Sequence, residues 1–194
     1  MFIEAILLSL IIGLIRGGKL RRFRGINHKT LWGLILGMLI QYILIFLNRI
    51  EEMKSIDNIL VYTREIIVIS YILILIGIIT NIKFRSLGAL LVGFVLNFIA
   101  LAANGWKMPI LLEGVALTGL DGLYELIEKG SSSLYIPISQ STKYPILGDI
   151  IIFSNPYPIT RIISLGDMII SFGIFAFILE IMLGEDSFMG DYRW

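Results

Sequence analysis

Five long apolar runs constrain the fold of this chain more than any other feature of its sequence. They are Phe2–Ile15, Leu31–Leu47, Ile66–Ile82, Leu87–Ala103 and Met168–Leu183. A helix rises about 1.5 Å per residue, so runs of this length reach the lower limit for crossing a hydrocarbon core of roughly 30 Å. Flanking residues and snorkelling Lys or Arg side chains extend that reach. Because 57% of the residues are hydrophobic, the sequence predicts a membrane protein rather than a soluble domain.

Basic residues are shared very unevenly among the segments between these runs. Residues 16–30 hold six bases and no acid: Arg16, Lys19, Arg21, Arg22, Arg24 and Lys29. The short segment 83–86 adds two more bases, whereas segments 48–65 and 104–167 hold more acids than bases. Cytoplasmic loops of membrane proteins are rich in Lys and Arg. We therefore predict a multi-pass protein of the cytoplasmic membrane, with its N-terminus outside and its C-terminus inside. Membrane lipids are the expected partners, and the bases call for no nucleic acid.

The long segment 104–167 is expected to form structure on the outer side of the membrane. Apolar residues recur at steps of three and four between Ile110 and Glu128, which is typical of an amphipathic helix. The segments Leu134–Ser139 and Ile146–Phe153 are short, β-branched and bounded by prolines, so they predict a small sheet or hairpin.

The predicted fold class is therefore all-α, with one integral membrane domain over residues 1–194. It is a five-helix transmembrane bundle carrying an extracytoplasmic amphipathic helix and a small β hairpin or sheet. With flanking residues included, the predicted spans are about 2–20, 31–47, 66–82, 87–103 and 168–183.

Few polar residues lie within the predicted spans, and two interpretations of them stand. The first is helix packing, with Gln41 and Asn97 forming hydrogen bonds between helices beside small residues such as Gly93. The second is a binding cavity. Asn97 and Asn104 are two helical turns apart and would line one face of it as substrate-binding residues.

Two aspartates outside the predicted spans are the candidates for catalysis. Asp149 follows Gly148, and Asp167 precedes the last apolar run. The intervening chain holds Pro156 and Pro158, which favour a bend that brings the aspartates together. Two carboxylates sharing one proton can work as general base and general acid.

A structural interpretation of the same residues is also open. Ser164 and Asp167 have the spacing of a capping box, in which a serine and an acid satisfy the first backbone N–H groups of a helix. A negative charge at that end also interacts favourably with the helix dipole. The pair Gly148–Asp149 would then be an ordinary turn.

Four segments resemble an uncharacterised family of bacterial integral membrane proteins, known as a domain of unknown function. These segments are Arg16–Phe23, Ala103–Ile110, Leu147–Ile151 and Ser164–Ile170. The resemblance covers most of the chain and implies a location in the bacterial cytoplasmic membrane. The family usually has a second glycine where Trp106 stands here.

A fainter resemblance, over the last two apolar runs, is to lipoprotein signal peptidases. Asn104, Asp149 and Asp167 follow one another in the order of that family's functional residues. The resemblance implies that the two aspartates form a catalytic dyad, acting on a membrane-bound or lipid-linked substrate at the outer face.

Three classes of function therefore remain open. The chain is an aspartate-dependent hydrolase, a non-enzymatic module that binds a lipid or small solute, or an accessory subunit of a membrane complex. The chain has no cysteine, which excludes thiolate metal ligands and cysteine nucleophiles. Neither a cofactor nor a metal site is predicted from the remaining residues.

Overall fold

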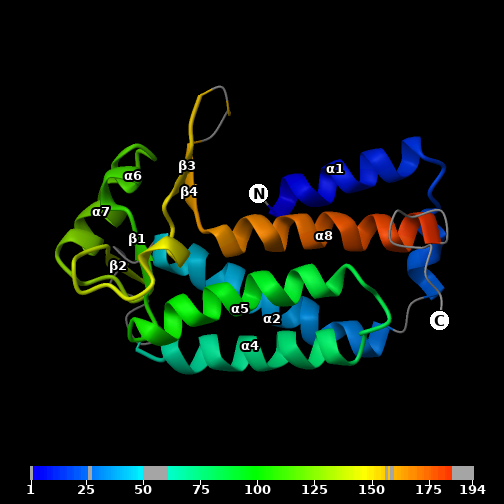
Figure 1. Ribbon diagram of the computed structural model, residues 1–194, viewed down its shortest axis with the longest axis horizontal. Coiled ribbons are helices and arrows are strands. Elements are labelled where there is room, and N and C mark those ends of the chain that lie inside the picture. The colour runs from blue at the N-terminus through cyan, green and yellow to red at the C-terminus, as the bar shows by residue number, and fades with distance from the viewer. Residues whose placement is uncertain (1, 26–27, 50–60, 156, 158–159, 185–194) are drawn as a thin grey trace.

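The computed structural model is a bundle of long helices with a smaller α/β cap at one end (Figure 1). It describes residues 2–25, 28–49, 61–155, 157 and 160–184. The long helices are α1 (Phe2–Ile15), α2 (His28–Arg49), α4 (Thr63–Ile79), α5 (Leu87–Ala103) and α8 (Leu165–Leu183). Helix α2 packs along α4, α5 packs along α8, and α1 lies against α8.

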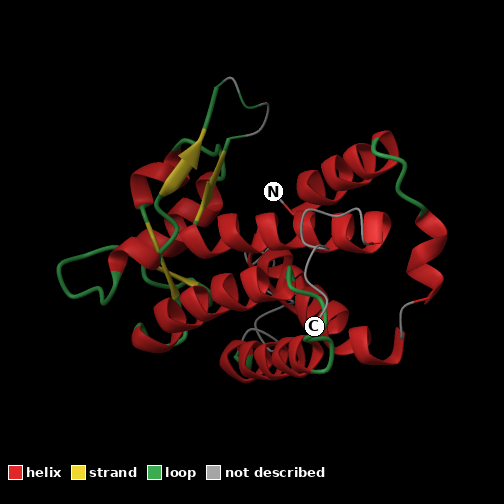
Figure 2. Ribbon diagram, turned by 45° about the vertical axis from the view of Figure 1, so that its right-hand side comes forward, coloured by secondary structure: helices red, strands yellow, loops and turns green. Residues whose placement is uncertain are grey.

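The cap lies between α5 and α8 in the sequence. Its helices are α6 (Leu112–Ala116), α7 (Asp121–Glu128) and the 3-10 turn η2 (Pro145–Leu147). Its strands are β1 (Met108–Ile110), β2 (Tyr135–Pro137), β3 (Ile151–Phe153) and β4 (Arg161–Ile163). Strands β1 and β2 are parallel, whereas β3 and β4 are antiparallel. Both sheets gather at one end of the bundle (Figure 2).

Two features of the cap differ from the sequence prediction. The single amphipathic helix expected between Ile110 and Glu128 is divided into α6 and α7. Gly119 lies between them with a φ of +70°, a backbone conformation that ends a helix and that glycine adopts readily. The expected small sheet is two sheets, and β3 finds its partner in β4, a segment that the apolar pattern did not mark as a strand.

Length and composition support membrane association for one of the described helices, α8. Among the described helices, only α8 is long and apolar enough to cross a bilayer, as judged by length and composition. Shorter apolar helical segments are Phe2–Ile15, Leu31–Leu47 and Leu87–Ala103. Large apolar side chains, such as Ile11, Trp32 and Ile76, are more than half exposed on the bundle. The five-span topology stays a prediction.

The end of the bundle opposite the cap is closed by polar side chains at helix ends. Glu180 of α8 accepts hydrogen bonds from the backbone N–H groups of Arg85 and Ser86, at 3.1 Å each, and from the Ser86 hydroxyl. It therefore satisfies donors at the start of α5 that no helical carbonyl can reach. Arg22, in the 3-10 helix η1 (Leu20–Gly25), donates to the carbonyl of Met182 at 2.7 Å near the end of α8.

Glycines allow two pairs of helices to approach closely. A Cβ atom added to Gly77 of α4 would lie within 3 Å of the backbone and side chain of Leu34 in α2. One added to Gly93 of α5 would lie 2.7 Å from the carbonyl oxygen of Gly166 in α8 and 2.9 Å from the nitrogen of Ile170. The expected role of small residues in helix packing is thus confirmed at Gly93.

Replacing Gly93 with alanine tests this packing. Gly93→Ala is expected to lower the free energy of unfolding by about 1–3 kcal/mol, because α5 and α8 must separate to admit the methyl group. Gly88→Ala in the same helix is the matched control, since no atom lies within 4 Å of its added Cβ. That change should be neutral or stabilise by up to about 1 kcal/mol through helix propensity. Equal unfolding midpoints for the two variants in detergent would contradict the close crossing.

Candidate functional site

Asp167 lies in the first turn of α8 and is held by a ring of three hydrogen bonds. The Asn97 amide donates to Asp167 Oδ1 at 2.8 Å, and the Ser164 hydroxyl donates to Asn97 Oδ1 at 2.8 Å. The backbone N–H of Asp167 donates to Ser164 Oγ at 2.9 Å and completes the ring. Ser164 is therefore the N-cap of α8, as one interpretation of the sequence predicted. The Asp167 carboxylate faces Asn97 and also interacts with the backbone N–H and the hydroxyl of Ser164, which is the reciprocal contact expected of a capping box.

Asn97 reaches Asp167 because α5 and α8 cross at glycine. Gly166 lies directly against the Asn97 side chain, so closely that an added Cβ would overlap Asn97 Oδ1. Asn97 itself is 8% exposed, and Ser164 is fully buried. Buried amides and hydroxyls need partners, and each of these two side chains finds its partners within the ring. Asn97 is thus confirmed as a residue that forms hydrogen bonds between helices.

Asp149 is held in the cap by its backbone. Its N–H donates to the carbonyl of Pro109 at 2.8 Å, and its own carbonyl accepts from the N–H of Leu111 at 2.9 Å. Gly148 allows this approach, because an added Cβ would lie 2.5 Å from the Pro109 carbonyl oxygen. The segment therefore pairs with β1 as a short extra strand, through a bridge between Ile110 and Asp149. The side chain of Asp149 is left free of the backbone pairing.

The Asp149 carboxylate lies in unfavourable surroundings for a charge. The residue is 7% exposed, and its Oδ1 atom has no hydrogen-bond partner among the described residues. Burial raises the pKa of Asp149 well above the usual carboxyl range, and the nearby charge of Asp167 raises it further. A buried carboxyl group with a raised pKa holds its proton to higher pH than an exposed one and is suited to donate it.

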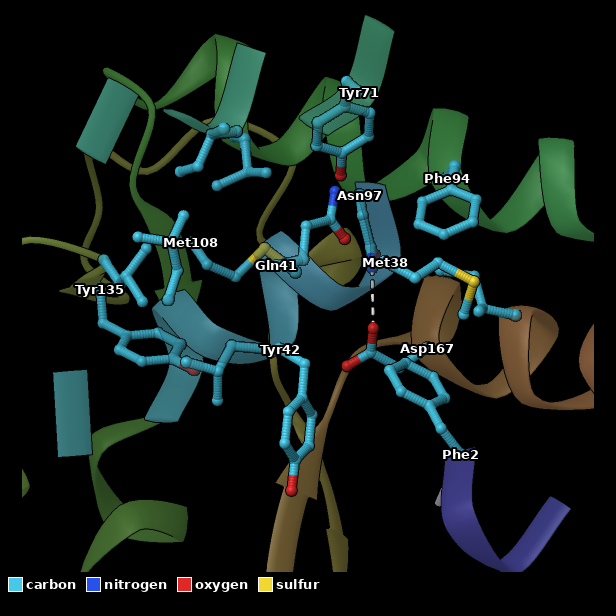
Figure 3. A pocket seen from close by; sticks show the side chains of 16 residues that line it. Phe2, Met38, Gln41, Tyr42, Tyr71, Phe94, Asn97, Met108, Tyr135 and Asp167 are labelled. Carbon is cyan, nitrogen blue, oxygen red and sulfur yellow. Dashed lines mark hydrogen bonds between the residues drawn. The ribbon is translucent and has the colours of Figure 1, made fainter. Parts of the chain in front are cut away.

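Two cavities meet at Asp167. The first, which we call the apolar chamber, has a volume of about 130 Å³ and lies between α2, α4, α5 and α8 (Figure 3). Its walls include Met38, Ile67, Phe94 and Met108. The second, which we call the outer cavity, has a volume of about 450 Å³ and extends into the cap. The two cavities share Phe2, Tyr42, Ile45, Tyr135 and Asp167.

The outer cavity contains both predicted catalytic aspartates. Asp149 and Asp167 line its wall together, although eighteen positions separate them in the sequence. Tyr42 lines both cavities and is 54% exposed, so the cavities reach the surface beside this side chain. Asn97 lines the apolar chamber and touches Asp167.

Asn104, the second predicted substrate-binding residue, is placed elsewhere. Its amide group donates to the carbonyls of Ala100 and Lys143, at 2.8 Å each, and accepts from the N–H of Lys143 at 2.9 Å. It lines neither the apolar chamber nor the outer cavity. In this position Asn104 joins the end of α5 to the segment that leads to Asp149.

Sequence reasoning missed a cluster of polar groups at the outer cavity. Arg161 of β4 forms an ion pair with Glu4 of α1, with 2.9 Å between Nη2 and Oε1. The Tyr157 hydroxyl donates to the same Glu4 oxygen at 2.8 Å, and the Arg161 guanidinium lies over the Tyr157 ring. No local pattern could reveal this cluster, because its members come from opposite ends of the chain.

The arrangement offers acid–base chemistry rather than a ligand set for a metal. Among the described residues, no group of three or more His, Cys, Asp or Glu side chains is placed to hold a metal ion. The outer cavity instead joins one carboxylate that accepts an amide hydrogen bond with one carboxyl group that is deeply buried. Such a difference in surroundings separates the protonation states of two acids.

Comparisons with known proteins identify a family but not an activity. Residues 25–179 match a family described as a family of unknown function (DUF5317). No curated protein matches the chain, and no solved structure matches it.

The raised pKa of Asp149 predicts how stability depends on pH. In the unfolded chain the pKa of this group is about 3.9, so the folded state holds the proton more tightly. This contribution to stability is complete below the unfolded value and is lost as pH rises through the folded value. Asp149→Asn resembles the neutral form and does not titrate at this position. The wild type therefore loses this stability as pH rises while the variant does not, so the free energy of unfolding of the variant minus that of wild type should increase as pH rises from about 4.

Denaturation of the purified protein across this pH range measures the effect. Asp121→Asn is the matched control, because Asp121 is exposed at the start of α7 and lines neither cavity. Parallel pH profiles for Asp149→Asn and wild type would contradict the buried, proton-holding state of Asp149.

Proposed function

We propose, for a chain that belongs to the DUF5317 family of unknown function, that Asp149 and Asp167 form the catalytic pair of a hydrolase that acts on a membrane-bound or lipid-linked substrate. The observation that carries the proposal is the shared wall of the outer cavity, on which both carboxyl groups lie. The fixed geometry of Asp167 supports it further, because a catalytic group works best when its neighbours hold it in place.

The proposal includes a location in the bacterial cytoplasmic membrane, with five spans and the cap outside. Helix α8 has the length and composition of a span. On other helices, large apolar side chains such as Leu7, Leu39 and Ile72 are half or more exposed, and exposed apolar side chains in such number favour contact with lipid over water. The bases of η1 lie at the end of the bundle opposite the cap, which fits a cytoplasmic position.

The proposed reaction is hydrolysis of an ester or amide bond. One carboxylate takes a proton from water as the water oxygen attacks the carbonyl carbon, and the other carboxyl group gives its proton to the carbonyl oxygen. Collapse of the tetrahedral intermediate breaks the bond to the leaving group, which receives a proton. The products are a carboxylic acid and an alcohol or amine. Asp149 is the proposed acid, because burial raises its pKa and keeps its proton in place.

A second candidate function is a non-enzymatic binding module for a lipid or small solute, on its own or as a subunit of a membrane complex. The apolar chamber favours it, because this cavity extends from Asp167 into the bundle, away from Asp149. A site of this composition, with apolar walls and few polar groups, is typical of small-molecule binding.

Cysteine labelling tests the proposed topology. Gln140 of the cap and Arg21 of η1 are both exposed, and the native chain has no cysteine. In intact cells an impermeant thiol reagent should label Gln140→Cys, whereas Arg21→Cys should react only after the cells are opened. The reverse result would overturn the orientation, and equal labelling of both positions in intact cells would overturn the separation of the two ends by a membrane.

Oxygen-isotope transfer tests for hydrolysis even while the substrate is unidentified. The protein in membranes from its own expression host is incubated in H2¹⁸O, and new ¹⁸O-carboxyl groups in lipids and peptides are measured by mass spectrometry. Wild type should produce labelled products. Asp149→Asn and Asp167→Asn should each lower the label by at least about a hundredfold, because the two residues of a pair work as a unit.

Asp121→Asn again serves as the matched control and should keep full activity, since it changes an exposed acid of the cap. Folded protein is quantified for every variant before the assay. Label that is equal in wild type and in both site variants would exclude hydrolysis by this pair, and would leave the binding module as the function.

A further inference from the structure

Acidic side chains outnumber basic ones among the described residues that line the outer cavity. Four charged residues line it: Glu4, Asp149, Arg161 and Asp167. Arg161 is already engaged, because it forms the ion pair with Glu4 and its guanidinium lies 5.2 Å from the centre of the Tyr157 ring. No other cation lines the cavity among the described residues. Among the described residues, neither Asp149 nor Asp167 forms an ion pair.

One of these groups has an unused acceptor. The Oδ1 atom of Asp149 is buried and has no hydrogen-bond donor within reach among the described residues. The backbone N–H and carbonyl of Asp149 are both hydrogen-bonded to the chain of β1 and the residue that follows it. The backbone therefore cannot turn to bring this carboxyl group to another partner. An unsatisfied buried acceptor of this kind destabilises the folded protein, and more so when it is charged. A ligand that donates a hydrogen bond removes this destabilisation.

The sign of the charge decides among possible ligands. An anionic group would lie beside two acids, and the cation among the described residues of the cavity, Arg161, is already paired to Glu4. A neutral hydroxyl would satisfy Asp149 Oδ1 but would bring no positive charge to the carboxyl groups. A protonated amine does both, because it donates up to three hydrogen bonds and its charge favours the ionised form of each carboxyl group.

The apolar chamber sets the size of the remainder of the ligand. Asp167 lines both cavities, so a group bound beside it has access to the chamber. The chamber measures about 130 Å³, and an apolar cavity of roughly 150 Å³ in another protein holds one benzene molecule. A hydrocarbon segment of about six carbons therefore fits. Tyr42 and Ile45, both partly exposed, flank the route from the surface.

We propose that the joined cavities bind a primary alkylammonium ion, with its nitrogen between Asp149 and Asp167 and its hydrocarbon segment in the apolar chamber. The inference goes beyond the hydrolase proposal, since it holds whether or not the pair is catalytic. Bound in this way, the amine keeps both carboxyl groups ionised and removes the acid that hydrolysis needs. An alkylamine is thus expected to inhibit any hydrolysis at this site.

Short, water-soluble alkyl compounds test the inference on the full chain. The protein is placed in nanodiscs of a zwitterionic lipid, and its thermal midpoint is followed at pH 7 against hexylamine, hexan-1-ol and hexanoate. Hexylamine should stabilise at concentrations at least about tenfold lower than hexan-1-ol, which is the gain expected for a charged hydrogen bond. Hexanoate should produce no shift. Among amines, the affinity should rise from methylamine to hexylamine as the chamber fills.

Variants locate the site. Asp149→Asn and Asp167→Asn should each reduce the affinity for hexylamine to that for hexan-1-ol, whereas Asp121→Asn should leave it unchanged. Equal affinities of wild type for hexylamine and hexan-1-ol would overturn the proposal. So would an amine preference that survives in both site variants. If either variant fails to fold, the other variant and the wild-type series still decide the outcome. Because binding is read without turnover, absence of hydrolysis in the isotope assay would leave this result untouched.

Discussion

The close crossing of α5 over α8 is the contact on which the rest of the site depends. Gly93 and Gly166 have no side chains to separate the helices, so the backbones approach closely. The amide of Asn97 is thereby carried to the start of α8, where it joins Ser164 and Asp167 in a closed ring of hydrogen bonds. A buried ring of this kind is satisfied only when all members are in place. The position of the Asp167 carboxylate therefore depends on the packing of α5 against α8.

The cap adds what the bundle lacks. Asp149 belongs to the cap and not to α8. Hydrogen bonds to Pro109 and Leu111 hold its backbone, and Gly148 permits the close approach of this segment to Pro109. Asn104 joins the end of α5 to the chain that precedes Asp149, so the same helix positions both aspartates. Trp106, at a left-handed φ of +66°, completes the turn between α5 and β1. The backbone of this turn is strained for a residue with a side chain, which explains why a glycine would suit the position.

The surroundings of the two carboxyl groups join an apolar region to a polar one. The chamber inside the bundle has mainly apolar walls, while the outer cavity carries all four charged residues of the site. Asp167 belongs to both cavities, so a ligand that contacts it can place hydrocarbon on one side and polar atoms on the other. Amphiphiles have this division between hydrocarbon and polar atoms. The hydrolase and the binding module thus require the same ligand chemistry and differ in whether a bond is broken.

Local sequence patterns located the long helices, because each needs only a continuous apolar segment of sufficient length. The run Leu31–Leu47 lies within α2, Leu87–Ala103 coincides with α5, and the cap of α8 at Ser164 was readable from its spacing to Asp167. The same patterns picked out both aspartates but not their arrangement. Which helices cross, where the chain of the cap pairs with β1, and that Glu4 meets Arg161 depend on contacts between distant residues. Such contacts are set by the packing of whole elements, and a local pattern carries no record of them. The sequence by itself therefore determined the helices and the candidate carboxyl groups, whereas only the tertiary structure decided that both groups share one cavity, because burial and charge act through space rather than along the chain.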